Sequence, residues 1–398
     1  MCQGGPVAGS SLRSAASGFS FDKTELSGAV ADVGVLVPIA VALIVQNGLA
    51  ATAVLLPPAL LYIVAAFRYQ LPVPVQPLKA FGAIAIALGL GVDEIAAGAL
   101  LLGALFLMLG VTGWLDRAGR WVPPAVIRGV QLTVGLLFLK IAWTLVSDPP
   151  SAFRQADWPS TVLIGGAVLV AVLAWALRRR PIALVLVGLA LVVMLLTGWD
   201  DLAFGPSAMP LPHLSMAAFA AAAGSLVLPQ APLTFANSCL APADAARTYF
   251  GVDRARRVTP GRLAVSLGAV DLLAGAIGGM PVCHGAGGMT AHRSFGARTG
   301  GAPLAMGVSL LVLALGFGAG LAALLTGFPL PILAGLLAVA GVLHVTLLKD
   351  LTRPVDWVIA LGVGLLGFMG YLAAAVVLGV AAGLAVRARD RRVARSQP

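Results

Sequence analysis

The stretch Pro-Val-Gln-Pro-Leu-Lys-Ala fills residues 74–80, and a related stretch, Met-Pro-Val-Cys-His-Gly-Ala-Gly-Gly, fills residues 280–288, about half the chain later. Each leads into a short apolar segment, at 76–90 and at 284–295. Because a spanning helix needs roughly 20 apolar residues, each segment is long enough for only about half of a bilayer core. Short apolar segments that follow prolines in corresponding halves of a chain predict two broken helices.

The composition predicts an all-α polytopic membrane protein. Of the 398 residues, 59% are hydrophobic and only 11% are charged, and the mean hydropathy is +0.97, far outside the range of soluble domains. Apolar segments of spanning length lie at 26–46, 49–66, 94–112, 124–146, 159–177, 181–198, 215–241, 261–278, 301–325, 329–347, 354–370 and 371–387. With the two broken segments counted as crossings 3 and 10, we predict fourteen transmembrane segments.

Fourteen crossings divide the chain into two halves of seven. We expect a first repeat at 26–200 and a second at 201–387, with an uncleaved N-terminal tail at 1–25 and a basic tail at 388–398. An odd number of crossings per half gives the halves opposite orientations, so the repeat is inverted. Inverted repeats with broken helices are typical of secondary transporters, in which the substrate binds near the membrane midplane.

The charges sort by loop and set the orientation. Loops assigned to one side carry most of the basic residues, among them Arg178–Arg180, Arg247, Arg254, Arg256, Arg257 and Arg262. The opposite loops carry one basic residue, Arg154, and several acidic ones, namely Asp93, Glu94, Asp148, Asp157, Asp200 and Asp201. By the positive-inside rule, we expect both termini to lie in the cytoplasm. We expect the protein to lie in the inner cell membrane. The net charge of +10 therefore reflects topology, and we expect no nucleic acid partner.

The first broken segment predicts binding of an anion. Gln76 is suited to cap a helix and Pro77 to the first helical position, so that backbone N–H donors point at the membrane centre. Lys79 falls in the first turn, where a cation opposes the helix dipole and is costly at membrane depth. A bound anion resolves both conflicts. The alternative is that Lys79 extends its amine to an interface.

The second broken segment predicts backbone contact with the same ligand. It opens with His284, Gly285, Ala286, Gly287 and Gly288, residues small enough for a ligand to touch the amides. Close helix packing is the alternative role for these glycines. Cys283, His284 and His292 would supply only three ligands to a metal, and positions 284 and 292 lie about two helical turns apart, so we do not predict a metal site. The three cysteines also give no disulfide framework, so we expect no metal and no cofactor.

These residues resemble a known family. Residues 74–80 and 280–288, with Arg-Ser-Phe-Gly-Ala-Arg-Thr-Gly at 293–300, are similar to the two signature motifs of the molybdate transporter family, a branch of the sulfate permease superfamily. The similarity extends to Glu25-Leu26-Ser27-Gly28, to Asp32-Val33-Gly34 and to Leu228–Thr234. Two departures are Ala31, where relatives usually carry glycine, and the stretch Thr290-Ala291-His292.

The resemblance implies molybdate uptake by a seven-plus-seven inverted repeat. It also implies a core domain, made of crossings 1–4 and 8–11, that moves against a gate domain made of crossings 5–7 and 12–14. A homodimer would be in keeping with it. The chain ends without the cytoplasmic regulatory domain common in sulfate permeases, which also suits the molybdate branch.

Several other polar residues have two open interpretations. Gln230, beside two prolines, is our preferred additional ligand, although polar residues there also bind helices together. Asp32 and Asp271 are candidates to carry a coupling proton or to serve as paired structural carboxylates. Arg128 and Lys140 are expected to be interfacial or structural. The alternative functions are transport of sulfate or another anion, a nucleobase permease, and a membrane enzyme that uses Cys283 and His284.

Overall fold

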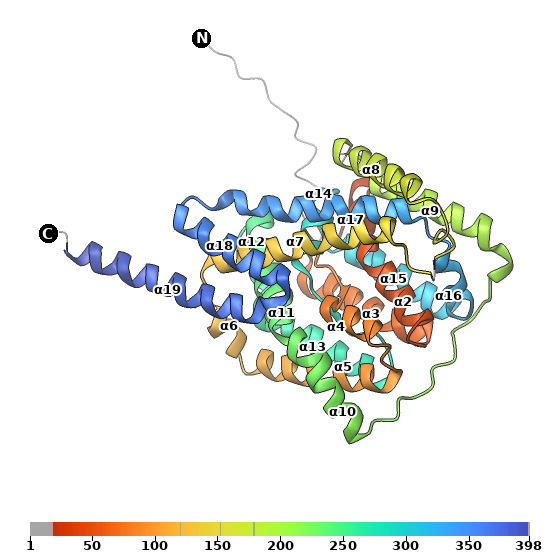
Figure 1. Cartoon of the computed structure of the whole chain (residues 1–398), viewed down its shortest axis with the longest axis horizontal. Coiled ribbons are helices and arrows are strands. Elements are labelled where there is room, and N and C mark those ends of the chain that lie inside the picture. The colour runs from red at the N-terminus through yellow and green to blue at the C-terminus, as the bar shows by residue number, and fades with distance from the viewer. Residues whose placement is uncertain (1–18, 120, 152, 178–179, 397–398) are drawn as a thin grey trace, which may run out of the picture.

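The structure is a computed structural model that describes residues 19–119, 121–151, 153–177 and 180–396 (Figure 1). In the first half the α-helices are α1 (Lys23–Ala29), α2 (Val33–Val45), α3 (Ala51–Tyr69), α4 (Lys79–Ala87), α5 (Val92–Val111), α6 (Trp114–Gly119), α7 (Pro124–Ser147), α8 (Ser160–Ala176) and α9 (Ile182–Gly198). In the second half they are α10 (Met216–Ala222), α11 (Leu228–Leu233), α12 (Ala241–Phe250), α13 (Pro260–Ala276), α14 (Ala286–Ser294), α15 (Gly301–Gly316), α16 (Gly318–Thr326), α17 (Leu330–Val345), α18 (Pro354–Leu366) and α19 (Leu372–Ser396).

The remaining elements are short. Two strands are present, β1 (Gln76–Pro77) and β2 (Val282–Cys283). The 3-10 helices are η2 (Val30–Asp32), η3 (Trp199–Asp201), η6 (Arg254–Arg257) and η7 (Thr346–Asp350), and the π-helical segments are η4 (Ala223–Val227), η5 (Thr234–Leu240) and η8 (Gly367–Tyr371).

The fold is that of a helical membrane protein, as the composition predicts. Within the described residues, six helices are long and apolar enough to cross a membrane, and α15 with α16, bent by 109°, makes a seventh. Helices α8 and α9 are apolar but have 17 residues each, about 26 Å at 1.5 Å per residue. The count of fourteen crossings stays a prediction.

The longest of the candidate membrane spans runs from Met216 to Phe250 and is irregular along its length. It extends beyond the predicted segment 215–241 and contains the π-helical segments η4 and η5 on either side of α11 (Figure 1). Pro232 lies inside α11, and because proline lacks an N–H, it removes a helical hydrogen bond. Such widened turns are frequent at functional sites, and here they flank Gln230.

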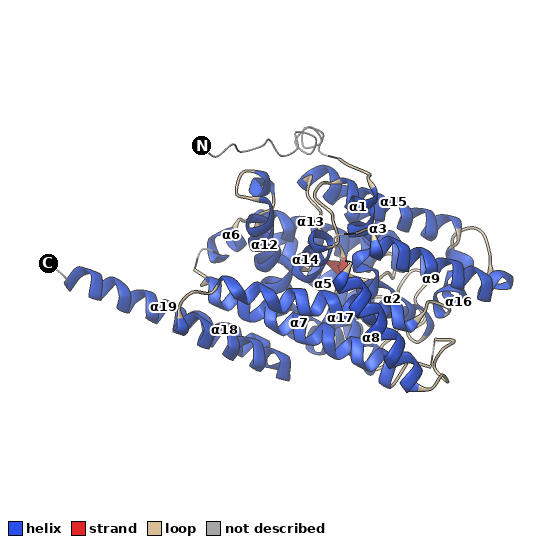
Figure 2. Cartoon of the chain, turned by 90° about the horizontal axis from the view of Figure 1, so that it is seen from above, coloured by secondary structure: helices blue, strands red, loops and turns tan. Residues whose placement is uncertain are grey.

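The two predicted broken segments form short helices that meet at a pair of strands. α4 and α14 have nine residues each, about 13 Å of helix. Strands β1 and β2 pair antiparallel, with Gln76 opposite Cys283 and Pro77 opposite Val282, and lie among the helices rather than at an edge (Figure 2). The two repeated motifs therefore cross each other.

Close helix pairs hold this crossing in place. Helices α5 and α13 pack so closely that a methyl group on Gly103 would lie 2.9 Å from the carbonyl oxygen of Gly268. Small residues recur at seven-residue spacing along this antiparallel seam, at Ala96, Gly103, Gly110, Gly261, Gly268 and Gly275. Helices α3 and α15 form a similar pair, in which Gly307 contacts Ala59 and Ile63. Small residues of this kind let membrane helices approach to backbone contact.

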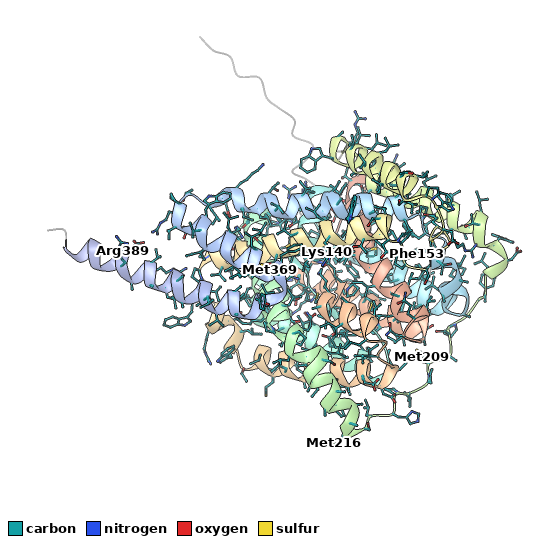
Figure 3. All side chains as sticks on the ribbon, viewed as in Figure 1. Lys140, Phe153, Met209, Met216, Met369 and Arg389 are labelled. Carbon is teal, nitrogen blue, oxygen red and sulfur yellow. The ribbon has the colours of Figure 1, made fainter. Side chains whose placement is uncertain are left out.

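A second group of helices packs together beside the first. Helix α7 packs on α17 through Gly135 and Gly341, and α18 packs on both α7 and α19. Figure 1 shows α7, α17 and α8 in one layer and α3, α5 and α13 in another. Lys140 of α7, labelled in Figure 3, places its Nζ 6.0 Å from the ring centroid of Phe368. Figure 3 also shows Arg389 on the end of α19 that projects from the body.

Glu25 ties α1 to the start of α15. Its carboxylate accepts hydrogen bonds from the backbone N–H groups of Arg298, Thr299 and Ala302 and from the Thr299 hydroxyl. Glu25 is 2% exposed, and a carboxylate suits the positive end of a helix. The segments Glu25–Gly28 and 293–300 of the family motifs therefore meet as one helix cap.

Candidate functional site

The starts of α4 and α14 come together at the β1–β2 crossing with backbone donors available. Neither helix has a side-chain hydrogen bond from its N-cap residue, Leu78 or Gly285. In the described part of the chain, no acceptor meets the backbone N–H groups of Lys79, Ala80, Ala286, Gly287 or Gly288. Uncapped helix starts of this kind are ready-made anion sites.

Lys79 supplies the positive charge between these two helix starts. It is the first residue of α4 and is 5% exposed. Its Nζ donates to Gln76 Oε1 at 2.7 Å and lies 5.4 Å from the ring centroid of Phe138. Among the described residues no carboxylate forms an ion pair with Lys79. The amine is therefore buried at the positive end of a helix, where a bound anion would compensate it.

Gly285 brings the second motif against this lysine. A methyl group on Gly285 would lie 2.0 Å from Gln76 Oε1 and 3.1 Å from Lys79 Nζ. The backbone at Gly285 is extended, with φ of −74° and ψ of 130°, a conformation open to any residue. Glycine is therefore required here for space and not for backbone freedom, and it lets Gln76 and Lys79 lie directly beside the start of α14.

The predicted helix cap in the first motif is wrong. Gln76 and Pro77 are extended in β1, and the helix begins only at Lys79, with Leu78 as its N-cap. Pairing with β2 fixes these residues in the extended conformation, and the N–H of Leu78 donates to the carbonyl of Pro281. Gln76 instead uses its side-chain oxygen to hold Lys79.

Helix α7 covers the site from the second helical group. A methyl group on Gly287 would lie 2.7 Å from Cε2 of Phe138 and 3.6 Å from a methyl carbon of Val134. Phe138, which also faces the Lys79 amine, is fully buried. Gly287 therefore offers its N–H to the site while its Cα faces α7. The sequence did not indicate this role for Phe138, because a phenylalanine in an apolar helix has no distinguishing signal.

Gln230 reaches the site indirectly. Its Oε1 accepts the N–H of Phe81 in the first turn of α4 at 2.9 Å, and its Nε2 donates to Thr234 Oγ1 at 2.9 Å. Gln230 therefore satisfies one N–H at the start of α4 from the neighbouring irregular helix.

His284 joins three elements of the crossing. Its Nδ1 contacts the Pro74 carbonyl at 2.9 Å and its Nε2 contacts Ser266 Oγ of α13 at 2.8 Å. With both ring nitrogens engaged, His284 cannot serve Cys283 as a base. Cys283 directs its thiol to the Pro77 carbonyl, and the described residues hold no group of three or more His, Cys, Asp or Glu arranged for a metal.

Asp271 brings a carboxylate to the second strand, which the motifs alone did not indicate. Its Oδ1 accepts the backbone N–H of Val282 at 2.7 Å. Its Oδ2 has no partner among the described residues, and the side chain is fully buried. Asp32, the other candidate for coupling, lies in η2, but its side chain is outside the described part of the structure.

This chemistry suits a ligand that has only acceptors. Uncapped backbone amides and one ammonium group lie at the adjoining starts of α4 and α14. A tetrahedral oxyanion offers oxygen atoms in several directions and has no proton to donate, so it matches donors that converge from two helix starts.

A family comparison identifies the chain. The model described as "Molybdate transporter of MFS superfamily" matches residues 24–138 and 222–343, together more than half of the chain. The chain belongs to the molybdate transporter family. Both motifs, Gln230 and Asp271 lie within the matched residues. The resemblance drawn from the motifs is confirmed.

Named relatives agree with this membership. Molybdate transporter 2 of Arabidopsis thaliana is 29% identical over 84% of this chain and 80% of its own length. Molybdate transporter 1 of Chlamydomonas reinhardtii is 28% identical over 92% of this chain and 93% of its own length. The members of this family are transporters and not enzymes, so the enzymatic alternative with Cys283 and His284 is set aside.

Solved structures share the fold at low identity. The murine solute carrier 26 family member A9 anion transporter, in its inward-facing state, aligns with a TM-score of 0.64 and 14% identity over 92% of this chain and 68% of its own. The transmembrane domain of the cyanobacterial bicarbonate transporter BicA aligns with a TM-score of 0.55 and 17% identity over 90% and 96%. The family description names the MFS superfamily, and the observed fold is shared with these two solved structures.

Proposed function

We propose that this protein takes up molybdate across the membrane as a secondary active transporter. The main support for this function is the pair of uncapped helix starts with Lys79 buried between them, because this arrangement offers hydrogen-bond donors and positive charge to an anion. Backbone amides of Lys79, Ala80 and residues 286–288 bind the oxyanion, and Lys79 adds the one full charge. Gln76 positions Lys79, Gln230 orients α4, and His284 fixes the crossing.

The proposed architecture is an inverted repeat of seven crossings in each half, at 26–200 and 201–387. The antiparallel crossing of the two motifs supports it. Gln76 and Cys283 occupy the same position in the two repeated motifs, and they also pair with each other across the two strands. The helix pairs support it as well. In an inverted repeat, crossing 4 (α5) is equivalent to crossing 11 (α15), and crossing 9 (α13) is equivalent to crossing 2 (α3). The packing of α5 on α13 is therefore repeated by the packing of α15 on α3.

We further propose two moving units. The core unit consists of crossings 1–4 and 8–11, which correspond to α1–α5 and α10–α16, and the gate unit consists of α7–α9 and α17–α19. The tightest helix pairs lie within these units, and Phe138 of the gate unit covers the anion site of the core unit. Movement of the core unit past Phe138 would expose the site to each side in turn.

The proposed orientation has both termini in the cytoplasm, with the protein in the inner cell membrane. The described arginines 254, 256, 257 and 262 lie together around the turn between α12 and α13, as the positive-inside rule requires of a cytoplasmic loop. Arg178, Arg179 and residues 1–18 of the predicted N-terminal tail lie outside the described residues. A homodimer remains an expectation from the resemblance.

Uptake by purified protein in liposomes tests the function. Labelled molybdate is supplied outside, with tungstate or sulfate as competitor and with or without an inward proton gradient. We expect accumulation of molybdate that tungstate suppresses and that sulfate suppresses less. Uptake no greater than in protein-free liposomes would reject the proposal, and equal competition by sulfate would favour a general oxyanion carrier.

Coupling is tested by the substitution Asp271→Asn. An asparagine keeps the hydrogen bond from Val282 through its oxygen but cannot release a proton, so the strand stays anchored. We expect uphill uptake to be lost while exchange of molybdate down its own gradient persists. Loss of both activities, or loss of the folded protein, would make Asp271 a structural carboxylate.

A further inference from the structure

Arg128 forms an ion-pair cluster that the anion site does not use. It lies near the start of α7, is 4% exposed, and pairs with Asp350 of η7 through two of its nitrogens and with Asp244 of α12 through a third. Its Nη1 also donates to Gln131 Oε1 at 3.0 Å. A buried arginine inside an apolar helix is costly unless its charge is paired.

The two carboxylates belong to different units of the proposed function, on which this inference rests. Arg128 in α7 and Asp350, which follows α17, both belong to the gate unit. Asp244 lies in α12 of the core unit (Figure 1). The Arg128–Asp350 pair is therefore internal to the gate unit. The Arg128–Asp244 pair joins the two units.

Helix α12 links the pair between units to the second half-helix of the anion site. Thr290, one turn after the start of α14, contacts the Tyr249 hydroxyl of α12 at 3.1 Å. Helix α12 also carries Asp244, which lines a cavity of about 440 Å³ together with Asp116, Arg247, Thr259 and Ile127. This cavity opens beside the turn that holds the arginine cluster of residues 254–257. We place it on the cytoplasmic side.

We propose that Arg128 and Asp244 form the cytoplasmic gate of the anion pathway, closed in this structure and open when the core unit moves. Asp350 makes the gate reversible. When Asp244 departs, Arg128 keeps one carboxylate and Gln131, so its charge never stands unpaired in the membrane. The Asp244 side chain is 28% exposed and is readily hydrated once released.

Cross-linking tests the proposal directly. In a background with Cys2, Cys239 and Cys283 replaced by serine, Arg128→Cys is combined with Asp244→Cys and treated with a short cleavable bis-maleimide. We expect treatment to abolish molybdate uptake and cleavage of the reagent to restore it. The matched control is the Arg128→Cys/Asp350→Cys protein, whose cross-link lies within the gate unit, and its uptake should be the same before and after treatment.

A second measurement does not depend on replacing Arg128. Ala243→Cys, on the wall of the cavity and 2% exposed, reports entry of an impermeant thiol reagent from the cytoplasmic side. Asp244→Asn should increase its labelling rate, because it weakens the closed state. Asp350→Asn should decrease it, because Arg128 then depends on Asp244 alone. Arg353→Gln, which removes an exposed pair with Asp390, should have no effect.

The outcomes separate the gate from the function. Uptake by the Arg128→Cys/Asp244→Cys protein that persists after cross-linking overturns the gate and leaves the proposed function intact. Equal changes in labelling rate for Asp244→Asn and Asp350→Asn overturn it as well. Absence of molybdate uptake in the unmodified protein overturns the proposed function itself.

Discussion

The substitution Gly285→Ala is expected to weaken molybdate binding strongly while leaving the protein folded. The new methyl group would lie 2.0 Å from Gln76 Oε1, so the carboxamide must move, and with it the hydrogen bond that holds the Lys79 amine. The backbone at Gly285 accepts alanine without strain. The cost therefore falls on the site and not on the fold. Calorimetric titration of molybdate measures the loss, and a thermal melt checks folding.

A matched glycine separates this effect from a general change in helix flexibility. A methyl group on Gly165 of α8 meets nothing within 4 Å, and alanine favours a helix over glycine. Gly165→Ala should therefore keep full binding. Wild-type affinity in Gly285→Ala would show that the space beside Gln76 and Lys79 is not part of the anion site.

The substitution Lys79→Ala is expected to weaken molybdate binding by about tenfold to a hundredfold, because a charge-assisted hydrogen bond contributes roughly 1.5 to 3 kcal/mol. The same change should leave the ligand-free protein as stable or more stable, since it removes a buried cation from the positive end of α4. Binding and stability thus move in opposite directions. Titration and thermal melts without ligand measure the two effects on one sample.

Lys79→Arg is the control for charge. It keeps the positive charge but places a larger planar group against Phe138 and Gly285, so we expect binding that is weaker than wild type and stronger than in Lys79→Ala. A Lys79→Ala protein that binds molybdate with unchanged affinity would place the anion elsewhere. A protein that melts well below wild type without ligand would make Lys79 a structural residue.

The two half-helices could be predicted because proline and short apolar length are local signals. Their starting residue could not. Gln76 and Pro77 have the local chemistry of a helix cap, but pairing with Val282 and Cys283 holds them extended, and this partner lies about half a chain away in sequence. A long-range contact overrode a local preference.

The roles of three motif residues depend on the same kind of contact. Glu25 and the segment 293–300 are far apart in sequence, and only the fold shows that the carboxylate caps α15. Gln230 was predicted as a ligand from its polar position next to prolines. The structure adds its bond to Phe81, which no pattern within 228–234 could indicate.

The role of Arg128 illustrates a signal that the sequence does contain. An arginine four residues into an apolar helix requires a partner of opposite charge. Asp244 and Asp350 fall in segments predicted to lie on the cytoplasmic side, together with other acidic residues such as Asp253, so the sequence analysis did not single them out. Which of them meets Arg128, and that both do, depends on packing between units.

Locating the anion tests the central account most directly. Tungstate, the heavy analogue of molybdate, gives a strong anomalous X-ray signal, so crystals of the protein grown with it would show the bound position without ambiguity. We expect one principal peak between the starts of α4 and α14, within hydrogen-bonding distance of Lys79 Nζ and the backbone N–H groups of residues 286–288. A principal peak at any other place in the membrane region, with the site between these helices empty, would contradict it.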